Sequence, residues 1–427
     1  MKTTFTLLVF FVIITLSGFS QDLDKIINDA EVLRIEKTLS ADDMQGRKPG
    51  TAGIKKAATF IADEFAKSGL QFLPGTKSYY QDFNVYKPKT LSTSATFDES
   101  VIKPEQIIVM SVEDSLAFDE KSDFEVVQIA AGAKLFPEVM KLIKAQKKYL
   151  VIIDTSYRTN FRRLTGLSRE MFSNTASVVF VLSAIKPGKY KIDIRQEITE
   201  IKLSNIVGFL PGKSRKEELV LFSGHYDHIG IGKPNPQKDS IYNGANDDAA
   251  GITAVIMLSK FFSKQKMHER SIVFVAFTAE ESGGFGSKYF SQQLDPAKTV
   301  AMFNIEMIGT ESKWGVNSAY ITGFEKSDLG SILQKNLEGS KFKFYPDPYP
   351  EQQLFYRSDN ATLAAQGVPA HTISTSKMDA EPYYHSADDE IETLDLQNMA
   401  EIIKSIAISS ESIINGKDTP SRVEIVK

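Results

Sequence analysis

Histidine and carboxylate side chains recur in the C-terminal half of the chain, at or just after the ends of short apolar runs. In chain order these residues are His225, Asp227, Asp247, Glu280, Glu281, Glu306 and His385. Zinc in proteins is bound by imidazole and carboxylate groups, and one carboxylate can bridge two ions. Each residue alone would carry little weight, because His-x-Asp and Glu-Glu pairs are common in proteins without a metal. Their joint occurrence in this order predicts a site for a pair of divalent cations.

The apolar runs before these residues have the composition of buried strands, being short, rich in β-branched and aromatic residues and bounded by turn residues. The predicted strands are Asn205–Leu210, Leu219–Ser223, Ser271–Phe277, Thr299–Ile305, Ala319–Thr322 and Val368–Ile373. Helices are predicted at Thr51–Gly69, Ala249–Phe262, Gly286–Leu294 and Leu396–Ile414. This alternation predicts an α/β fold: a three-layer sandwich with a mostly parallel mixed sheet covered on both faces. Ligand sites in such folds gather at the carboxyl ends of the strands.

The same patterns divide the chain into parts. Within residues 87–200, short β-rich runs such as Phe124–Ala130 and Tyr149–Asp154 alternate with polar stretches, which predicts an inserted β-rich subdomain. The predicted parts are a signal peptide (1–20), the N-terminal part of the catalytic domain (21–86), the insertion (87–200), the catalytic domain proper (201–416) and a tail (417–427).

The first 20 residues have the features of a secretory signal peptide. Lys2 supplies a positive start, Phe5–Leu16 is apolar and uncharged, and Gly18 and Ser20 are small residues at the positions that a signal peptidase reads. The apolar run is short for a membrane span, so we expect export to the periplasm or medium without a stable anchor.

Composition excludes several other classes of protein. The chain has no cysteine, which excludes disulfides, thiolate zinc ligands and attachment of a lipid through cysteine. The net charge of −4 becomes −5 without Lys2, and a weakly acidic chain with dispersed charges argues against a nucleic-acid partner.

Five stretches together resemble the co-catalytic di-zinc aminopeptidases, a family that includes aminopeptidase Y, glutamate carboxypeptidase and glutaminyl cyclase. These stretches are Ser223–Gly230 (SGHYDHIG), Asn243–Gly251 (NGANDDAAG), Thr278–Ser287 (TAEESGGFGS), Asn304–Gly309 (NIEMIG) and Tyr383–Asp389 (YYHSADD). Leu39–Gly53 and Asn205–Gly212 are also similar to the family. The resemblance covers the catalytic domain nearly end to end and says little about residues 87–200, where some members carry a protease-associated insert.

The resemblance implies two zinc ions per chain. Asp247 would bridge them. His225 and Glu306 would complete one zinc site. Glu281 and His385 would complete the other. Glu306 departs from the usual aspartate, although glutamate also occurs at this position in parts of the family.

The resemblance also implies roles for residues that do not hold the metals. Glu280 would be the general base that takes a proton from the attacking water. Asp227 would orient the ring of His225, since a ligating imidazole usually donates its other N–H to a carboxylate or carbonyl. Tyr384 would donate a hydrogen bond to the developing oxyanion, and Arg357 would help hold the substrate carbonyl.

Three functions are compatible with this resemblance. The first is an exopeptidase acting on peptides, most simply an aminopeptidase, with carboxypeptidase and dipeptidase left open. The second is a glutaminyl cyclase, whose members tend to carry tryptophan beside the last histidine, where this chain has Tyr384. The third is a non-catalytic binding protein, which the filled ligand positions oppose. His228 and His371 are predicted to line the pocket or the core rather than to bind metal.

Overall fold

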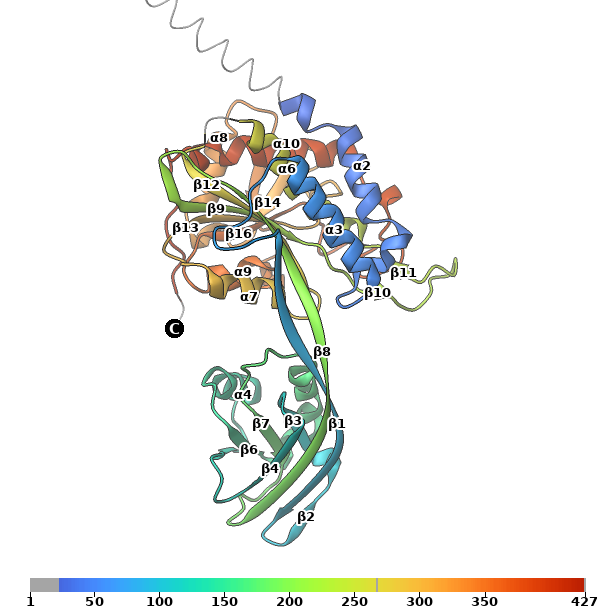
Figure 1. Cartoon of the computed structure of the whole chain (residues 1–427), viewed down its shortest axis with the longest axis vertical. Coiled ribbons are helices and arrows are strands. Elements are labelled where there is room, and N and C mark those ends of the chain that lie inside the picture. Colours follow the sequence, from blue (N-terminus) through green and yellow to red (C-terminus); the bar gives the residue numbers. More distant parts are fainter. Residues whose placement is uncertain (1–22, 266–267, 426–427) are drawn as a thin grey trace, which may run out of the picture. The chain divides into compact units, whose positions relative to one another are not determined.

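The computed structural model describes residues 23–265 and 268–425, so the predicted signal peptide lies outside the described residues (Figure 1). The chain forms two compact units. One comprises the residues up to Asp82 and from Leu203 onward, and the other comprises Phe83–Lys202. None of the helices within the described ranges combines the length and apolar character that a membrane crossing requires.

The first unit is built on a mixed sheet in the strand order β15-β14-β16-β13-β9-β12-β8. These strands are β8 (Tyr190–Leu210), β9 (Arg215–His225), β12 (Arg270–Phe277), β13 (Thr299–Ile305), β14 (Ser318–Ile321), β15 (Lys343–Pro346) and β16 (Ala370–Ser374). Four neighbouring pairs are parallel (β12 with β9, β9 with β13, β13 with β16, and β14 with β15). The pairs of β12 with β8 and of β14 with β16 are antiparallel. The predicted mostly parallel mixed sheet is therefore confirmed.

Helices cover both faces of this sheet, as Figure 1 shows. In β9, Val220 and Phe222 pack into the core on one side, and Leu221 between them packs into the core on the other. Because successive strand residues point to opposite faces, burial of both faces produces the continuous apolar runs seen in the sequence. The first face is covered by α2 (Asp29–Leu39), α3 (Ala52–Lys67), α6 (Ala250–Lys264), α8 (Leu329–Asn336) and α10 (Leu396–Ile414). The second face is covered by α7 (Phe285–Gln293) and α9 (Asn360–Ala364). This is the predicted three-layer sandwich.

The helix predicted at Thr51–Gly69 is α3, and its start differs in one detail. Thr51 occupies the N-cap position, but its hydroxyl donates to the carbonyl of Lys48 and makes no capping bond to the helix. Gly69 follows the helix with a φ of +75°, a conformation in which glycine is favoured.

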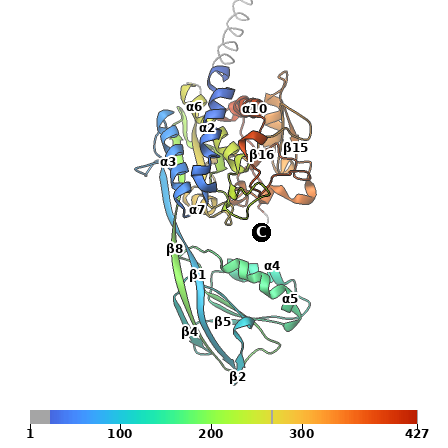
Figure 2. The same cartoon turned by 90° about the vertical axis from the view of Figure 1, so that its right-hand side faces the viewer.

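The second unit is rich in strands and has its own cores. Its strands are part of β1 (Tyr80–Phe97), β2 (Ser100–Ile102), β3 (Ile107–Met110), β4 (Ser115–Asp119), β5 (Glu125–Ile129), β6 (Tyr149–Ile153), β7 (Val178–Leu182) and the first part of β8. Strands β3, β7, β6 and β5 form a separate four-stranded sheet. Helices α4 (Leu135–Lys144) and α5 (Arg158–Phe161) pack on one face of that sheet (Figure 2).

Candidate active site

His225 is the last residue of β9, and its ring is almost completely buried. Its Nδ1 lies 3.1 Å from the backbone carbonyl oxygen of Asp227. A carbonyl oxygen can only accept, so Nδ1 carries a proton and Nε2 is left to face the site. The carboxylate of Asp227 lies 3.9 Å from Nδ1, beyond hydrogen-bond distance. In this structure the ring is held by a hydrogen bond to the backbone of Asp227, and the Asp227 carboxylate lies close to the same nitrogen.

Asp247 lies in the tight turn Ala245–Ala249 that leads into α6, and it is buried. The carboxylate of Asp389 holds this turn from outside by accepting hydrogen bonds from the backbone amides of Asn246 and Asp247 at 2.8 and 3.0 Å. The side chain of Asp247 is left free of those bonds and points into the site, where its Oδ1 lies 3.2 Å from Nε2 of His225.

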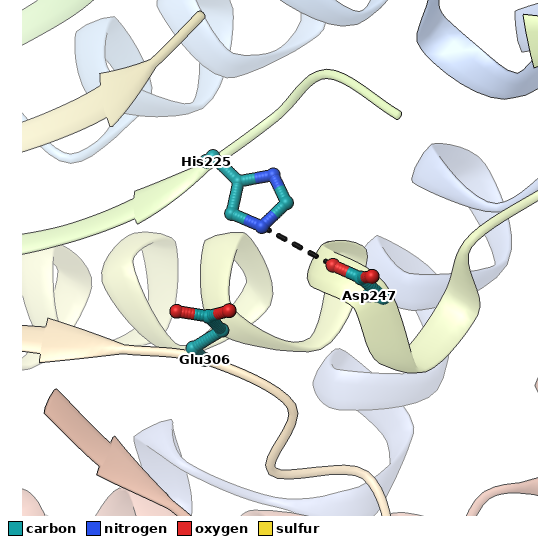
Figure 3. A group of neighbouring side chains, drawn as sticks. All are labelled: His225, Asp247 and Glu306. Atoms are coloured by element: carbon teal, nitrogen blue, oxygen red, sulfur yellow. Dashed lines mark ion pairs between the residues drawn. The ribbon is translucent and has the colours of Figure 1, made fainter. Parts of the chain in front are cut away.

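Glu306 follows the last residue of β13, the strand beside β9 in the sheet. Its carboxylate and the side chains of His225 and Asp247 point toward one another from three different elements (Figure 3). One potential ligand atom from each of the three lies within 4.8 Å of the others. The structure thus brings together the three residues of the first predicted metal site.

A second group of potential ligands shares Asp247. It combines Asp247 with Glu281 and His228, with one ligand atom from each within 4.8 Å of the others. Nε2 of His385 also reaches this group and lies 3.3 Å from Oδ2 of Asp247 and 3.2 Å from Oε2 of Glu281. The predicted pair of Glu281 and His385 is therefore adjacent to Asp247, as the resemblance implies.

His228 lies closer to this group than the sequence suggested. Its Nδ1 is 2.8 Å from Oε1 of Glu281, and the side chain is fully buried. Its ring centroid is 5.8 Å from that of His385, so two imidazoles flank the same carboxylate. A histidine three residues after His225, in the loop after a strand, is the only sequence signal that could have placed it here. His371, by contrast, is buried away from the ligands and bonds to Ser327 and the carbonyl of Thr322.

Glu280 and Glu281 follow β12, and their backbone is held by Asp227. The Asp227 carboxylate accepts hydrogen bonds from the amides of Glu280 and Glu281 at 3.0 and 3.3 Å. Burial, with the nearby charges of Glu306 and Asp359, raises the pKa of Glu280 well above its usual range. A carboxylate of raised pKa accepts a proton more readily near neutral pH.

Asp248 connects the backbone segments that carry the first group of potential ligands. Its carboxylate is fully buried and accepts hydrogen bonds from the amide of His225 in β9, the amide of Met307 after β13 and the amide of Gly251 in α6. One side chain thereby holds three separate segments of the fold. This role leaves no signal in the sequence, because it depends on contacts between distant segments.

The donor set fits divalent cations. Within the described residues, buried Nε2 of His225 and Oε2 of Glu306 make no well-aligned hydrogen bond, and neither does Oε1 of Glu281, although Nδ1 of His228 lies 2.8 Å from it. Nε2 of His225 faces a carboxylate oxygen, so a proton or another cation must lie between them. Burial disfavours a charged His225, but the surrounding carboxylates, with Asp247 first, raise its pKa well above the usual range. The same negative field would bind a metal ion in place of that proton.

The two groups open into one cavity. Its lining includes Asp247, Glu280, Glu281, Glu306 and His385, together with Tyr384, Arg357 and apolar residues such as Leu354 and Met378. The ring of Tyr384 stacks on that of His385, with centroids 3.9 Å apart. Arg357 is exposed, and its guanidinium contacts Gln352. Both residues that the sequence predicted to contact substrate therefore border the cavity.

Residues 205–408 match peptidase family M28. The chain contains an M28 peptidase domain. All the predicted ligands, Glu280, Tyr384 and Arg357 lie within the matched M28 region. A probable leucine aminopeptidase of Trichophyton verrucosum is 27% identical over 210 residues, which are 47% of this chain and 54% of that protein. This chain therefore spans about half the length of that relative.

Solved structures resemble the chain over most of its length. A zinc aminopeptidase from Bacillus subtilis has a TM-score of 0.57 at 16% identity and covers 94% of this chain and 99% of its own. Glutaminyl cyclase from Porphyromonas gingivalis has a TM-score of 0.50 at 11% identity and covers 91% of this chain and 99% of its own. At these identities the similarity shows that the M28 domain has their fold.

Proposed function

We propose that this chain is an exported zinc-dependent exopeptidase, specifically an aminopeptidase, that binds two zinc ions and uses Glu280 as general base. One observation carries the proposal. Two groups of potential ligands share Asp247 and open into the cavity that Glu280 also lines. The M28 match and the named aminopeptidase relative support the same reaction class. Support for export comes from the features of residues 1–20.

Each residue then has a defined task in the hydrolysis of a peptide bond. A pair of zinc ions held by these ligands would lower the pKa of the attacking water and polarise the carbonyl of the substrate. Glu280 accepts the proton of the attacking water and delivers it to the leaving amine. No nucleophilic side chain is needed for this reaction.

Tyr384 and Arg357 are suited to the substrate carbonyl. Burial, with the nearby charge of Asp247, raises the pKa of the Tyr384 phenol, so this group remains a proton donor at neutral pH. A phenol at the edge of the cavity can donate a hydrogen bond to an oxygen that becomes negative in the transition state. Arg357 borders the same cavity with a cationic group that binds carbonyl oxygens.

Removal and return of metal test the reaction class. Purified protein is dialysed against a chelator, its zinc content is measured, and hydrolysis of aminoacyl amides is followed before and after zinc is returned. We expect activity to disappear with the metal and to return as zinc content approaches two per chain. Full peptidase activity in metal-free protein would contradict the proposal.

A panel of substrates tests the assignment as an aminopeptidase. Each aminoacyl amide is compared with its N-acetylated form, and we expect only the free amine to be hydrolysed. Equal rates on both forms would exclude an aminopeptidase. Release of ammonia with ring closure from a substrate with N-terminal glutamine, without peptide hydrolysis, would indicate the alternative cyclase instead.

A further inference from the structure

Arg47 is a fully buried arginine outside the set of ligands. It ends the short 3-10 segment Asp42–Arg47, which follows α2. Gly46, directly before it, has a φ of +60°, and a Cβ at this position would lie 2.4 Å from the carbonyl oxygen of Tyr242. Only glycine permits so close an approach. The turn therefore packs closely on the segment that contains Tyr242, and the side chain of Arg47 is buried.

The guanidinium of Arg47 donates four hydrogen bonds to backbone carbonyl oxygens. Nε donates to Tyr226 at 2.9 Å, and Nη2 donates to Gly244 at 2.8 Å. Nη1 donates to Asn243 at 2.5 Å and to Leu39 at 2.7 Å. These bonds use the planar fork of the guanidinium and connect three segments that are far apart in the sequence.

Two of those segments carry metal-ligand candidates. Tyr226 is the residue after His225, and Gly244 lies three residues before Asp247. The backbone carbonyl of Arg47 also accepts a hydrogen bond from the amide of His228 at 3.3 Å. Through these bonds Arg47 holds the backbone near Asp247, beside His225 at the end of β9 and beside His228 in the loop that follows.

The charge of Arg47 is not used in an ion pair. Within the described residues no carboxylate lies within ion-pair distance of its guanidinium, although the charges of Glu36, Asp389, Asp227 and Asp247 act on it. Burying a cation that bonds only to carbonyl oxygens costs folding free energy. We therefore expect Arg47 to have a function that a neutral side chain could not provide.

We infer that Arg47 is a positioning residue for the metal centre, which holds the loops of His225 and Asp247 in the geometry that two cations require. The inference rests on the proposed function, because it assigns Arg47 to the zinc site of that function. It predicts that loss of the guanidinium weakens metal binding before it affects the rest of the fold.

The test uses the full chain with three substitutions. Arg47→Met removes the donors, and Arg47→Lys keeps the charge while replacing the fork by a point donor that cannot span four carbonyls. Arg270→Met is the matched control. Arg270 is equally buried and donates to the carbonyls of Ile413 and Asp418, at the C-terminal end of the chain, and to Glu218.

Zinc affinity, measured by competition with a chromogenic chelator, is the primary measurement, and Tm in chelator and in zinc is the second. We expect the zinc dissociation constant to rise about 10–100-fold in both Arg47 variants, as for other residues that support metal ligands. We expect the extra Tm that zinc confers to shrink accordingly. The Arg270 variant should lower Tm in both conditions and leave zinc affinity unchanged.

The outcomes distinguish a specific role of Arg47 at the metal centre from a general effect on stability. Wild-type affinity for zinc in Arg47→Lys would overturn the inference, and this variant decides the question if Arg47→Met fails to fold. An equal loss of zinc affinity in the Arg270 variant would also overturn it, because the effect would then be one of general stability. Wild-type protein that binds no zinc would overturn the proposed function itself, and this inference with it.

Discussion

At the scale of single residues, the site is a concentration of negative charge in which the carboxylates pair with imidazoles. The ion pairs of Asp247 and Glu281 within the described residues involve histidines alone. Burial raises the pKa of Glu306 to about 7, whereas the imidazoles beside Asp247 overcome burial and hold its pKa far below the usual range.

Glu280→Gln tests the assignment of the proton acceptor. The amide has the same size, keeps the backbone bonds to Asp227 and cannot accept the proton, so we expect kcat to fall by ~10²–10⁴-fold. Zinc content and Tm should remain near the wild-type values, because Glu280 is not in either group of potential ligands. Turnover close to wild type would remove Glu280 from the mechanism.

Glu306 is the ligand candidate that departs from the family's usual aspartate. We expect Glu306→Ala to lose one zinc ion on dialysis and most of the activity, and Glu306→Asp to keep part of both, because a shorter carboxylate retains the charge. Glu311→Ala is the control, since Glu311 is exposed and pairs with Lys377 at the surface. Two tightly bound zinc ions and an unchanged rate in Glu306→Ala would show that Glu306 is not a ligand.

At the scale of elements, the strands and helices of the first unit were largely predictable. Strand β13 and helix α10 have the predicted bounds, because burial on both faces of the strand and a long amphipathic period leave clear patterns. Strand β1 was not predicted, since much of it is exposed and polar and it contains Pro88. Arg47 and Asp389 were beyond prediction for a different reason. Their tasks consist of hydrogen bonds to segments distant in the sequence, which leave no periodic signal.

The helices on one face of the sheet are also joined by a charged cluster around Glu64 of α3. The carboxylate of Glu64 is 1% exposed and lies 2.7 Å from Arg34 of α2, 2.7 Å from Lys260 of α6 and 2.9 Å from Lys67. Burial alone would raise its pKa, but hydrogen bonds from these three side chains lower the pKa to about 2.

Glu64→Gln should therefore destabilise the protein in a pH-dependent way. Because the folded-state pKa is depressed below the ordinary 4.5, the stabilisation is present above pH 4.5 and is lost as pH falls toward 2. We expect a loss of about 1–3 kcal/mol at pH 7 that shrinks steadily below pH 4.5, measured by urea unfolding. Asp43→Asn removes an exposed pair with Lys56 and should change stability by under about 0.5 kcal/mol. A pH-independent effect of Glu64→Gln would contradict this account.

At the scale of the whole molecule, the two units have separate cores. The apolar clusters of Phe83–Lys202 contain no residue of the clusters that cover the two faces of the main sheet. The potential metal ligands all belong to the unit that contains the M28 match. Stability of the second unit should accordingly depend on its own packing, and stability of the first should depend on packing and on metal together.

Calorimetry of the full chain tests this independence. We expect two unfolding transitions, since each unit has its own core and the chain passes between them only within β1 and β8. Ile152→Ala, in the core of the second unit, should destabilise one transition by about 2–5 kcal/mol and leave the other in place. Ile272→Ala, equally buried in β12, should destabilise the transition of the first unit and leave that of the second unit in place. A chelator should lower only the transition that Ile272→Ala lowers, because ligand binding stabilises only the unit that binds. A single transition that both substitutions and the chelator shift alike would show instead that the units unfold as one.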